Sequence, residues 1–298
     1  MRLDDPGSSN NFIDRTGSSG GGPMLGGGGG LIGLFLPLIL SRFGIVGLLI
    51  LALGYCALGG LGGGGLLSGG GNPATQQTSG AASTLSPQNA QLLRSVLEST
   101  DQTWGQIFSA AGQQYAEPRL IAYTAGTQTA CGMGQAAMGP FYCPADQNIY
   151  IDPTFFNQLS QRFGAPGDFA QAYVIAHEVG HHVQNLEGTL DRASRAQARA
   201  NEATGNQIQV GVELQADCYA GVWAAQARNR DGSRILEAGD LEEGMRAAEA
   251  IGDDTLMREA GRAVRPESFT HGTSAQRMEA LRRGLTTGNP AACNYNRV

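Results

Sequence analysis

The sequence contains no lysine, so all 20 of its cations are arginine, and we draw no functional conclusion from this absence. Positive charge is scarce as well, because 26 acidic residues outnumber the arginines and give a formal net charge of −6. No basic patch stands out, so nucleic acid is not expected as a partner. The sequence also lacks a short basic segment that leads directly into an apolar core, so a cleavable signal peptide is not expected. Histidine is rare, with four residues.

Glycine, in contrast, is abundant, with 45 of 298 residues and most of the excess before residue 75. Residues 1–30 are polar and then glycine-rich, which predicts a disordered N-terminal tail. Residues 31–61 are the expected membrane anchor. Within it, residues 43–61 carry no charge and approach the ~20 residues that a helix needs to span a bilayer. We favour one span there over a hairpin of two, because residues 31–40 are few and include Pro37.

The positions of arginine set the expected orientation of this anchor. Arg2, Arg15 and Arg42 precede the span, and no arginine follows it until Arg94. The positive-inside rule then places the N-terminus in the cytoplasm and exports the remainder. We therefore expect a single-pass protein of the cell membrane, with its catalytic domain outside the cytoplasm. Residues 62–86, mostly Gly, Ser, Thr, Gln and Ala, are the expected flexible linker.

A folded domain is predicted over residues 87–298, because Ser86-Pro87 is a typical helix start. Apolar residues at helical spacing predict several helices after it. Two short apolar runs, 120–123 and 148–152, predict strands. The glycine-rich stretch 131–143 between them is expected to be a loop. The expected fold is α+β, a mainly helical domain with a small sheet.

Three of the four histidines lie in the stretch 177–182, which contains the pattern His-Glu-x-x-His. An apolar stripe through this stretch predicts a helix, on which His177 and His181 share a face and can direct their imidazoles at one metal ion. Glu178 is rotated by ~100° and lies beside the ion, where a general base acts on the attacking water. A chance match is the alternative, because only three positions of the pattern are fixed. His182 points away from the pair and is interpreted as a neighbour, not a ligand.

A second helix, expected over residues 207–228, supplies two carboxylates that share a face, those of Glu213 and Asp217. A catalytic zinc ion takes three protein ligands and leaves a fourth position open, so we expect Glu213 to complete the set. Asp217 is placed to accept the outer N–H of a ligand histidine. A solvated acidic face is the alternative interpretation of this pair, and Glu202 is the alternative third ligand.

Five cysteines are present, of which Cys56 lies in the expected anchor and is interpreted as inert. In an exported domain we expect the other four to pair, Cys131 with Cys143 and Cys218 with Cys293. Free thiols in a cytosolic domain, or a role in metal binding, are the alternatives.

The fourth histidine, His271, precedes a helix for which Ser274 is the expected N-cap. A loop histidine can donate a hydrogen bond to the oxyanion of a tetrahedral intermediate, or it can be an ordinary surface residue. Arg277 is placed to pair with a carboxylate of the site or to hold this loop. The strand at 148–152 is a candidate edge for an extended peptide substrate.

Three segments in this order resemble the bacterial neutral zinc metallopeptidase family. They are His-Glu-Val-Gly-His-His-Val-Gln at 177–184, Glu-Leu-Gln-Ala-Asp-Cys-Tyr-Ala-Gly at 213–221 and Thr-His-Gly-Thr-Ser-Ala-Gln-Arg at 270–277. The resemblance covers nearly the whole chain. More distantly, the combination of His-Glu-x-x-His with Glu-x-x-x-Asp is similar to the gluzincins.

This resemblance implies a zincin-like domain in which His177, His181 and Glu213 bind zinc and Glu178 is the catalytic base. In gluzincins of the membrane-peptidase type, a histidine in a Thr-His-Pro segment contributes to transition-state stabilisation. The resemblance extends this role to His271, with Gly272 in place of the proline.

The expected function is that of a membrane-anchored, zinc-dependent endopeptidase acting on a peptide or protein substrate. The alternative is a membrane-tethered, zinc-containing binding or regulatory protein with little or no proteolytic activity. The presence of Glu178 argues against the alternative, because a structural zinc site needs no base and is usually closed by four protein ligands.

Overall fold

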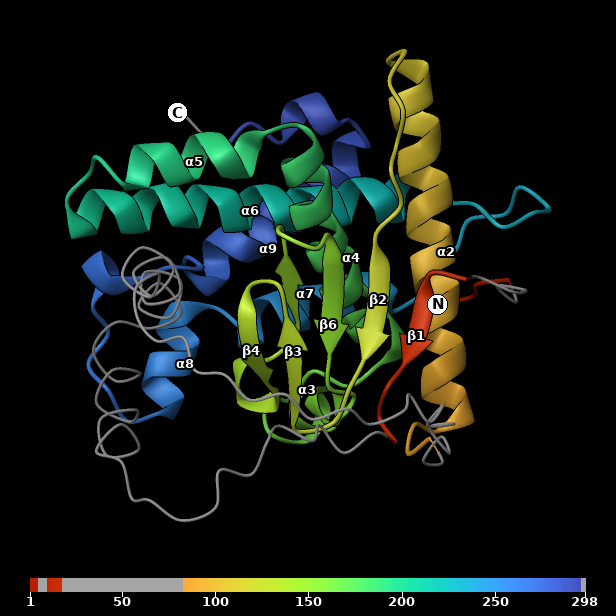
Figure 1. Ribbon diagram of the computed structural model, residues 1–298, viewed down its shortest axis with the longest axis horizontal. Helices are drawn as coiled ribbons and strands as arrows, with labels where there is room; N and C mark the ends of the chain where they lie inside the picture. The colour runs from red at the N-terminus through yellow and green to blue at the C-terminus, as the bar shows by residue number, and fades with distance from the viewer. Residues whose placement is uncertain (5–9, 18–82, 296–298) are drawn as a thin grey trace, which may run out of the picture.

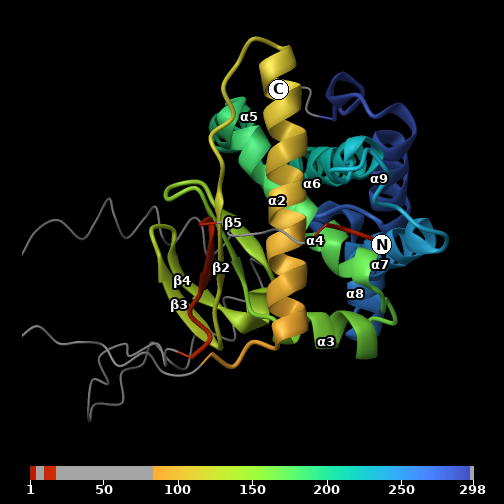
Figure 2. The ribbon, with the colours of Figure 1, turned by 90° about the vertical axis from the view of Figure 1, so that its right-hand side faces the viewer.

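The computed structural model of the protein describes residues 1–4, 10–17 and 83–295. A layer of strands lies on one side of the long helix α2, and most of the other helices lie on the opposite side (Figures 1 and 2). The helices are α2 (Pro87–Ala110), α3 (Thr154–Gln161), α4 (Asp168–Leu186), α5 (Thr189–Gln197), α6 (Glu202–Gln226), α7 (Asp240–Ala250), α8 (Asp253–Glu259) and α9 (Ser274–Thr287). Short 3-10 turns occur at Ala136–Met138, Pro266–Ser268 and Pro290–Ala292.

The strands form two small sheets. They are β1 (Phe12–Asp14), β2 (Arg119–Ala122), β3 (Gly126–Thr129), β4 (Gly132–Gln135), β5 (Phe141–Cys143) and β6 (Asn148–Ile151). The larger sheet has the order β1-β2-β6-β5, with β1, β2 and β6 parallel and β5 antiparallel to β6. Strands β3 and β4 form an antiparallel pair. The predicted α+β class with mainly helical content is therefore confirmed.

The two helices that carry the sequence motifs lie in the core. Helix α4 buries most of its side chains, and α6 is buried continuously from Val212 to Ala224. Helix α2 begins as predicted, because the Ser86 side chain accepts a hydrogen bond from Asn89 N and Pro87 occupies the first turn. A motif helix enclosed in this way holds its side chains in fixed positions, since surrounding atoms restrict their rotamers.

Both predicted disulfides are present, Cys131–Cys143 and Cys218–Cys293. The second joins the middle of α6 to the C-terminal segment. Among the described residues, no helix combines the length and apolar character that a membrane crossing needs. The predicted anchor at 31–61, which contains Cys56, and residues 62–82 of the predicted linker lie outside the described part of the chain.

The prediction of a disordered tail over residues 1–30 is wrong for residues 1–4 and 10–17. Residues Phe12–Asp14 form β1, and Phe12 is only 8% exposed. Its pairing partner β2 lies more than a hundred residues further along the chain, so the local composition that suggested disorder contained no sign of it.

Three smaller predictions also need correction. The stretch 131–143 is not a simple loop, because it contains β4 and β5, which are too short and too rich in glycine for an alternating pattern to be visible. The strand β6 is not an open edge for a substrate, since β2 and β5 flank it on both sides. The N-cap of α9 is Thr273 rather than Ser274, in a capping box with Gln276.

Candidate metal centre

The site forms where α4 crosses α6. A Cβ atom added at Gly180 would lie 2.9 Å from the carbonyl oxygen of Ala216, closer than packed atoms allow. Glycine inside the His-Glu-x-x-His pattern therefore lets the two backbones approach closely at this point. Because Glu213 lies one turn before Ala216 on α6, this approach brings its carboxylate to the histidines of α4.

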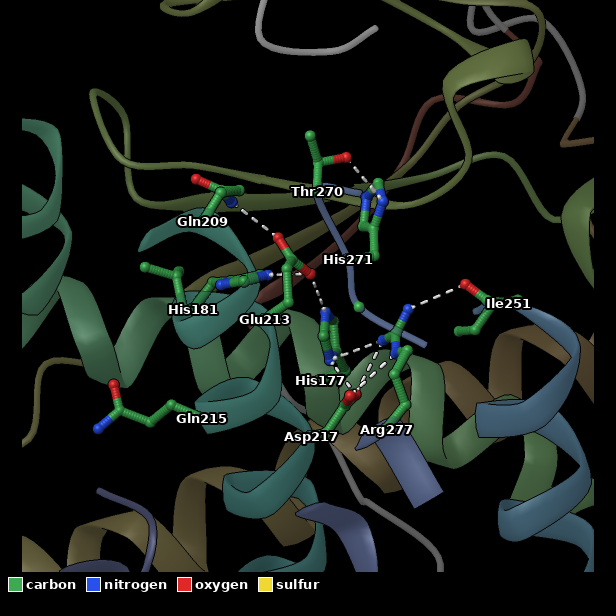
Figure 3. A network of polar contacts seen from close by, with 12 residues as sticks. His177, His181, Gln209, Glu213, Gln215, Asp217, Ile251, Thr270, His271 and Arg277 are labelled. Carbon is green, nitrogen blue, oxygen red and sulfur yellow. Dashed lines mark hydrogen bonds and ion pairs between the residues drawn. The ribbon is translucent and has the colours of Figure 1, made fainter. Parts of the chain in front are cut away.

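His177, His181 and Glu213 converge as predicted. The Glu213 Oε2 atom lies 3.2 Å from His177 Nε2 and 3.6 Å from His181 Nε2. One ligand atom from each of the three residues lies within 4.8 Å of the others. Figure 3 shows the Glu213 carboxylate between the two imidazoles, with its second oxygen accepting from Gln209 Nε2 at 2.9 Å. The three donor atoms face one small volume.

The Nδ1 atom of each imidazole is hydrogen-bonded to a partner, and this bond orients the ring so that its Nε2 atom faces the small volume between the three residues. Asp217 Oδ1 lies 2.8 Å from His177 Nδ1, which is the predicted carboxylate partner. Gln184 Oε1 lies 2.9 Å from His181 Nδ1. Both partners are themselves fully buried. Each Nε2 atom is therefore directed at Glu213, and the imidazoles are held as metal-binding imidazoles usually are.

Asp217 is the centre of a buried polar network that links α4, α6 and α9. Arg277, from the first turns of α9, donates from Nη2 to Asp217 Oδ1 at 2.8 Å and from Nε to Oδ2 at 2.9 Å. The Tyr173 hydroxyl donates to Asp217 Oδ1 at 2.6 Å. Arg277 therefore pairs with a carboxylate of the site, which was one of its two predicted roles. Its positive charge lowers the pKa of Asp217 and so keeps that carboxyl ionised.

Electrostatics at the site favour a bound cation. Burial alone would lower the pKa of His177, but Asp217 and then Glu213 raise it to about 10. Burial would raise the pKa of Glu213, but the charge of His181 and hydrogen bonds from both histidines hold it well below its ordinary range. Without a metal ion, the carboxylates of Asp217 and Glu213 favour a proton on the His177 imidazole that lies between them. A divalent cation bound to His177 and Glu213 would balance the same negative charges.

Glu178 is buried beside this group, with an exposed fraction of 7%. Burial raises the pKa of its carboxyl, and the charges of His181 and His177 oppose the shift. A carboxylate whose pKa is shifted towards neutrality is suited to accept and return a proton near pH 7.

His271 lies on the loop before α9, above Glu213 in Figure 3. Asp253, at the start of α8, holds this loop: its Oδ2 accepts from the backbone N–H groups of Thr270, His271 and Gly272 at 2.7, 2.7 and 3.1 Å. Its Oδ1 lies 3.1 Å from His271 Nδ1. The burial of His271 would lower its pKa, but Asp253 and Glu213 raise it. Gly272 has φ +90°, which proline cannot adopt, so this loop takes a different path from a Thr-His-Pro segment.

The structure separates the predicted alternatives. Glu202 is exposed in the first turn of α6 and is not part of the histidine group, so it is not the third member. His182 is turned away, with Nδ1 3.0 Å from the Tyr142 hydroxyl and Nε2 bonded to the Ala116 carbonyl. Its imidazole connects α4 to the sheet layer, as expected for a neighbour of the pair.

Four members of the site were not predicted: Tyr173, Gln184, Gln209 and Asp253. Tyr173 precedes His177 by four residues and Gln184 follows His181 by three, so both lie on the ligand face of α4 and helical spacing alone pointed to them. Asp253 had no such signal, because only the tertiary fold brings the start of α8 to the loop at His271.

The sequence matches the family described as "Putative neutral zinc metallopeptidase" over residues 1–295. One relative is the "Uncharacterized protein YpfJ" of Escherichia coli K12, 44% identical over 301 residues that cover 99% of this chain and 98% of that protein. Another is the "Uncharacterized protein Rv2575" of Mycobacterium tuberculosis H37Rv, 42% identical over 188 residues, or 60% of this chain and 62% of that protein. No solved structure matches. Since the match extends over almost the entire chain and includes the three converging residues, this protein belongs to the neutral zinc metallopeptidase family.

Proposed function

We propose that the protein is a zinc-dependent endopeptidase in which His177, His181 and Glu213 bind the metal ion. The observation that carries the proposal is the convergence of two imidazole nitrogens and one carboxylate oxygen within 4.8 Å, beside a buried glutamate. Within the described residues no fourth histidine, cysteine or carboxylate joins the group. Three ligands with an open position are typical of catalytic zinc, whereas structural zinc is usually enclosed by four.

The geometry of the three residues fits a zinc ion. Ligand atoms placed tetrahedrally at ~2.0–2.2 Å from zinc are about 3.3 Å apart. The two distances from Glu213 Oε2 to the histidine nitrogens, 3.2 and 3.6 Å, lie close to this value. The donor set of two imidazoles and one carboxylate is also one that zinc accepts in hydrolases.

The residues of the chain then have distinct parts in peptide hydrolysis. Bound zinc would polarise the scissile carbonyl and acidify water. Glu178 accepts a proton from the attacking water and passes it to the leaving amine. His271 donates a hydrogen bond to the oxygen on which negative charge develops, while Asp253 engages Nδ1 and leaves Nε2 for the substrate.

We also propose that the protein is anchored in the cell membrane through residues 31–61 and that the catalytic domain lies outside the cytoplasm. Two disulfides support this location, because they persist in oxidising compartments. The substrate would be a peptide or protein, and the net charge of −6 gives no reason to expect nucleic acid.

The test is cleavage of a peptide library by the full-length protein and by a Glu178→Gln variant, with zinc content measured in both. Glutamine keeps the volume of the side chain but cannot accept the proton, so cleavage should fall by about 10²–10⁴-fold while zinc content stays the same. Zinc binding without cleavage in either protein would favour the binding or regulatory alternative. Equal cleavage by both proteins would contradict the role of Glu178.

A further inference from the structure

The N-terminal residues belong to the same folded unit as the metallopeptidase domain. Strand β1 pairs in parallel with β2, with Phe12 opposite Leu120 and Asp14 opposite Ala122. The Phe12 ring is buried in the main core, and the Arg94 guanidinium of α2 lies 4.9 Å from its centroid. Figure 1 shows β1 beside β2 and α2. Strand β1 is therefore an integral strand of the larger sheet and contributes to the core of the domain.

Residues 1–4 attach to the helical layer as well. The Met1 amino group lies 3.0 Å from Asp168 Oδ1, at the start of α4, and 2.9 Å from Asp240 Oδ1, at the start of α7. The backbone N–H of Arg2 donates to the carbonyl of Ile235 at 2.9 Å. The first residues are thus in contact with the same helix that carries His177 and His181.

The two ends of the described chain on either side of residues 18–82 also meet. The backbone N–H of Thr84 donates to Thr16 Oγ1 at 3.1 Å, and Thr84 Oγ1 donates to the carbonyl of Thr16 at 3.3 Å. The Ser83 hydroxyl donates to Asp14 Oδ2. The described residues on either side of 18–82 therefore lie next to one another.

From these contacts we infer that residues 1–17 and residues 83–295 lie on the same side of the membrane. Groups that hydrogen-bond at about 3 Å cannot be on opposite sides of a hydrocarbon core ~30 Å thick. The predicted orientation, with the N-terminus and the domain on opposite sides of one span, is incompatible with this arrangement. The membrane is then crossed an even number of times between Gly17 and Ser83.

The sequence is compatible with two crossings. Residues 16–41 and 43–93 each contain no charged residue, and Arg42 alone separates them. The apolar part of the second stretch, residues 43–61, approaches the ~20 residues that one span requires, whereas the aliphatic part of the first, residues 31–40, is shorter and would need the neighbouring glycine-rich residues to complete a crossing. In such a hairpin Arg42 would lie on the side of the membrane opposite to Arg2, Arg15 and the domain, so the positive-inside rule alone does not decide which side that is.

Cysteine labelling of the full-length protein in spheroplasts tests the inference. In a Cys56→Ser background, one variant carries Asn10→Cys and another carries Ser194→Cys, both at exposed positions outside the candidate site. A membrane-impermeant maleimide is added before or after permeabilisation. An Arg2→Cys variant provides a second N-terminal reporter at an exposed position.

We expect the N-terminal and domain positions to label under the same condition, either all before permeabilisation or all only after it. Labelling of one region in intact spheroplasts and of the other only after permeabilisation would overturn the inference. The inference rests on the proposed membrane anchor but not on the proposed peptidase activity, so the peptidase activity and the inference can fail separately.

Discussion

The imidazole of His181 is fixed by the amide of Gln184. The amide nitrogen of Gln184 donates to the Val212 carbonyl at 2.8 Å and to Gln215 Oε1 at 2.9 Å. Its oxygen is therefore the atom that faces His181 Nδ1, and Nδ1 must carry the proton. Nε2 is then the nitrogen directed at Glu213 and left for a metal ion.

A Gln184→Ala variant should accordingly bind zinc about 10–100-fold more weakly, the usual effect of losing a partner that orients a ligand. The dissociation constant can be measured by competition with a chromogenic chelator. Asn185→Ala is the matched control, since Asn185 donates to Tyr142 and not to a ligand residue. Equal zinc affinity of Gln184→Ala and the native protein would show that this amide does not position His181.

At this scale the sequence predicted the convergence of His177, His181 and Glu213, because helical spacing and the count of zinc ligands leave few choices. It also predicted Asp217 as a partner of a histidine. The contact between Asp253 and His271 could not be predicted, since no local pattern relates the start of α8 to a loop eighteen residues later.

One buried ion pair joins α6 to α9, and α4 is tied to it by hydrogen bonds from Tyr173 and His177. Asp217 is fully buried and Arg277 is 2% exposed, so neither charge is solvated by water. Burial would raise the pKa of Asp217, but the charges of Arg277 and His177 hold it well below its ordinary range. Such a pair adds modest stability when intact but leaves a costly unpaired charge when one member is removed.

Replacement of Asp217 by Asn should therefore lower the free energy of unfolding of the metal-free protein by about 3–5 kcal/mol, because the Arg277 guanidinium loses its counter-charge. Urea denaturation of the zinc-stripped protein measures the change. Asp191→Asn is the control: Asp191 pairs with Arg195 on the surface of α5, and its loss should change stability little. Similar effects of the two substitutions would contradict the assigned importance of the buried pair.

Elements of different length differ in how well they could be predicted. Helices α2 and α4 have long periodic apolar stripes and a recognisable start, so the sequence located them to within a few residues. Helix α6 was predicted from residue 207 but begins at Glu202, because its N-cap Asn201 was not recognised. Strand β1 has three residues, and its stability comes from pairing with β2 and covering the core, neither of which is encoded locally. The predicted single-pass topology treated the N-terminal segment as independent of the domain, and it stays a prediction that the labelling experiment above tests.

For the molecule as a whole, metal binding and stability should be linked through pH. In the metal-free protein the pKa of His177 is about 10, above its ordinary value of 6.5. A raised pKa contributes stability that is fully present below pH 6.5 and is lost as pH rises through about 10. When a metal ion occupies Nε2, this ring has no such proton to lose.

We therefore expect the zinc-stripped protein to lose stability between pH 7 and pH 9, and the stabilisation by added zinc to grow over the same interval, by proton release and mass action. Denaturation with and without a chelator at several pH values measures both. A stripped protein whose free energy of unfolding stays constant over this interval would contradict the charge arrangement at His177.

The account as a whole depends on Glu213 completing a metal site with the two histidines of α4. The most direct test compares the zinc affinity of the native protein with those of Glu213→Ala and Glu202→Ala, two substitutions of the same kind on the same helix. We predict that Glu213→Ala weakens zinc binding by more than the ~10–100-fold expected for an outer partner, while Glu202→Ala leaves it unchanged. Native zinc affinity in Glu213→Ala would contradict the proposed site and the peptidase function based on it.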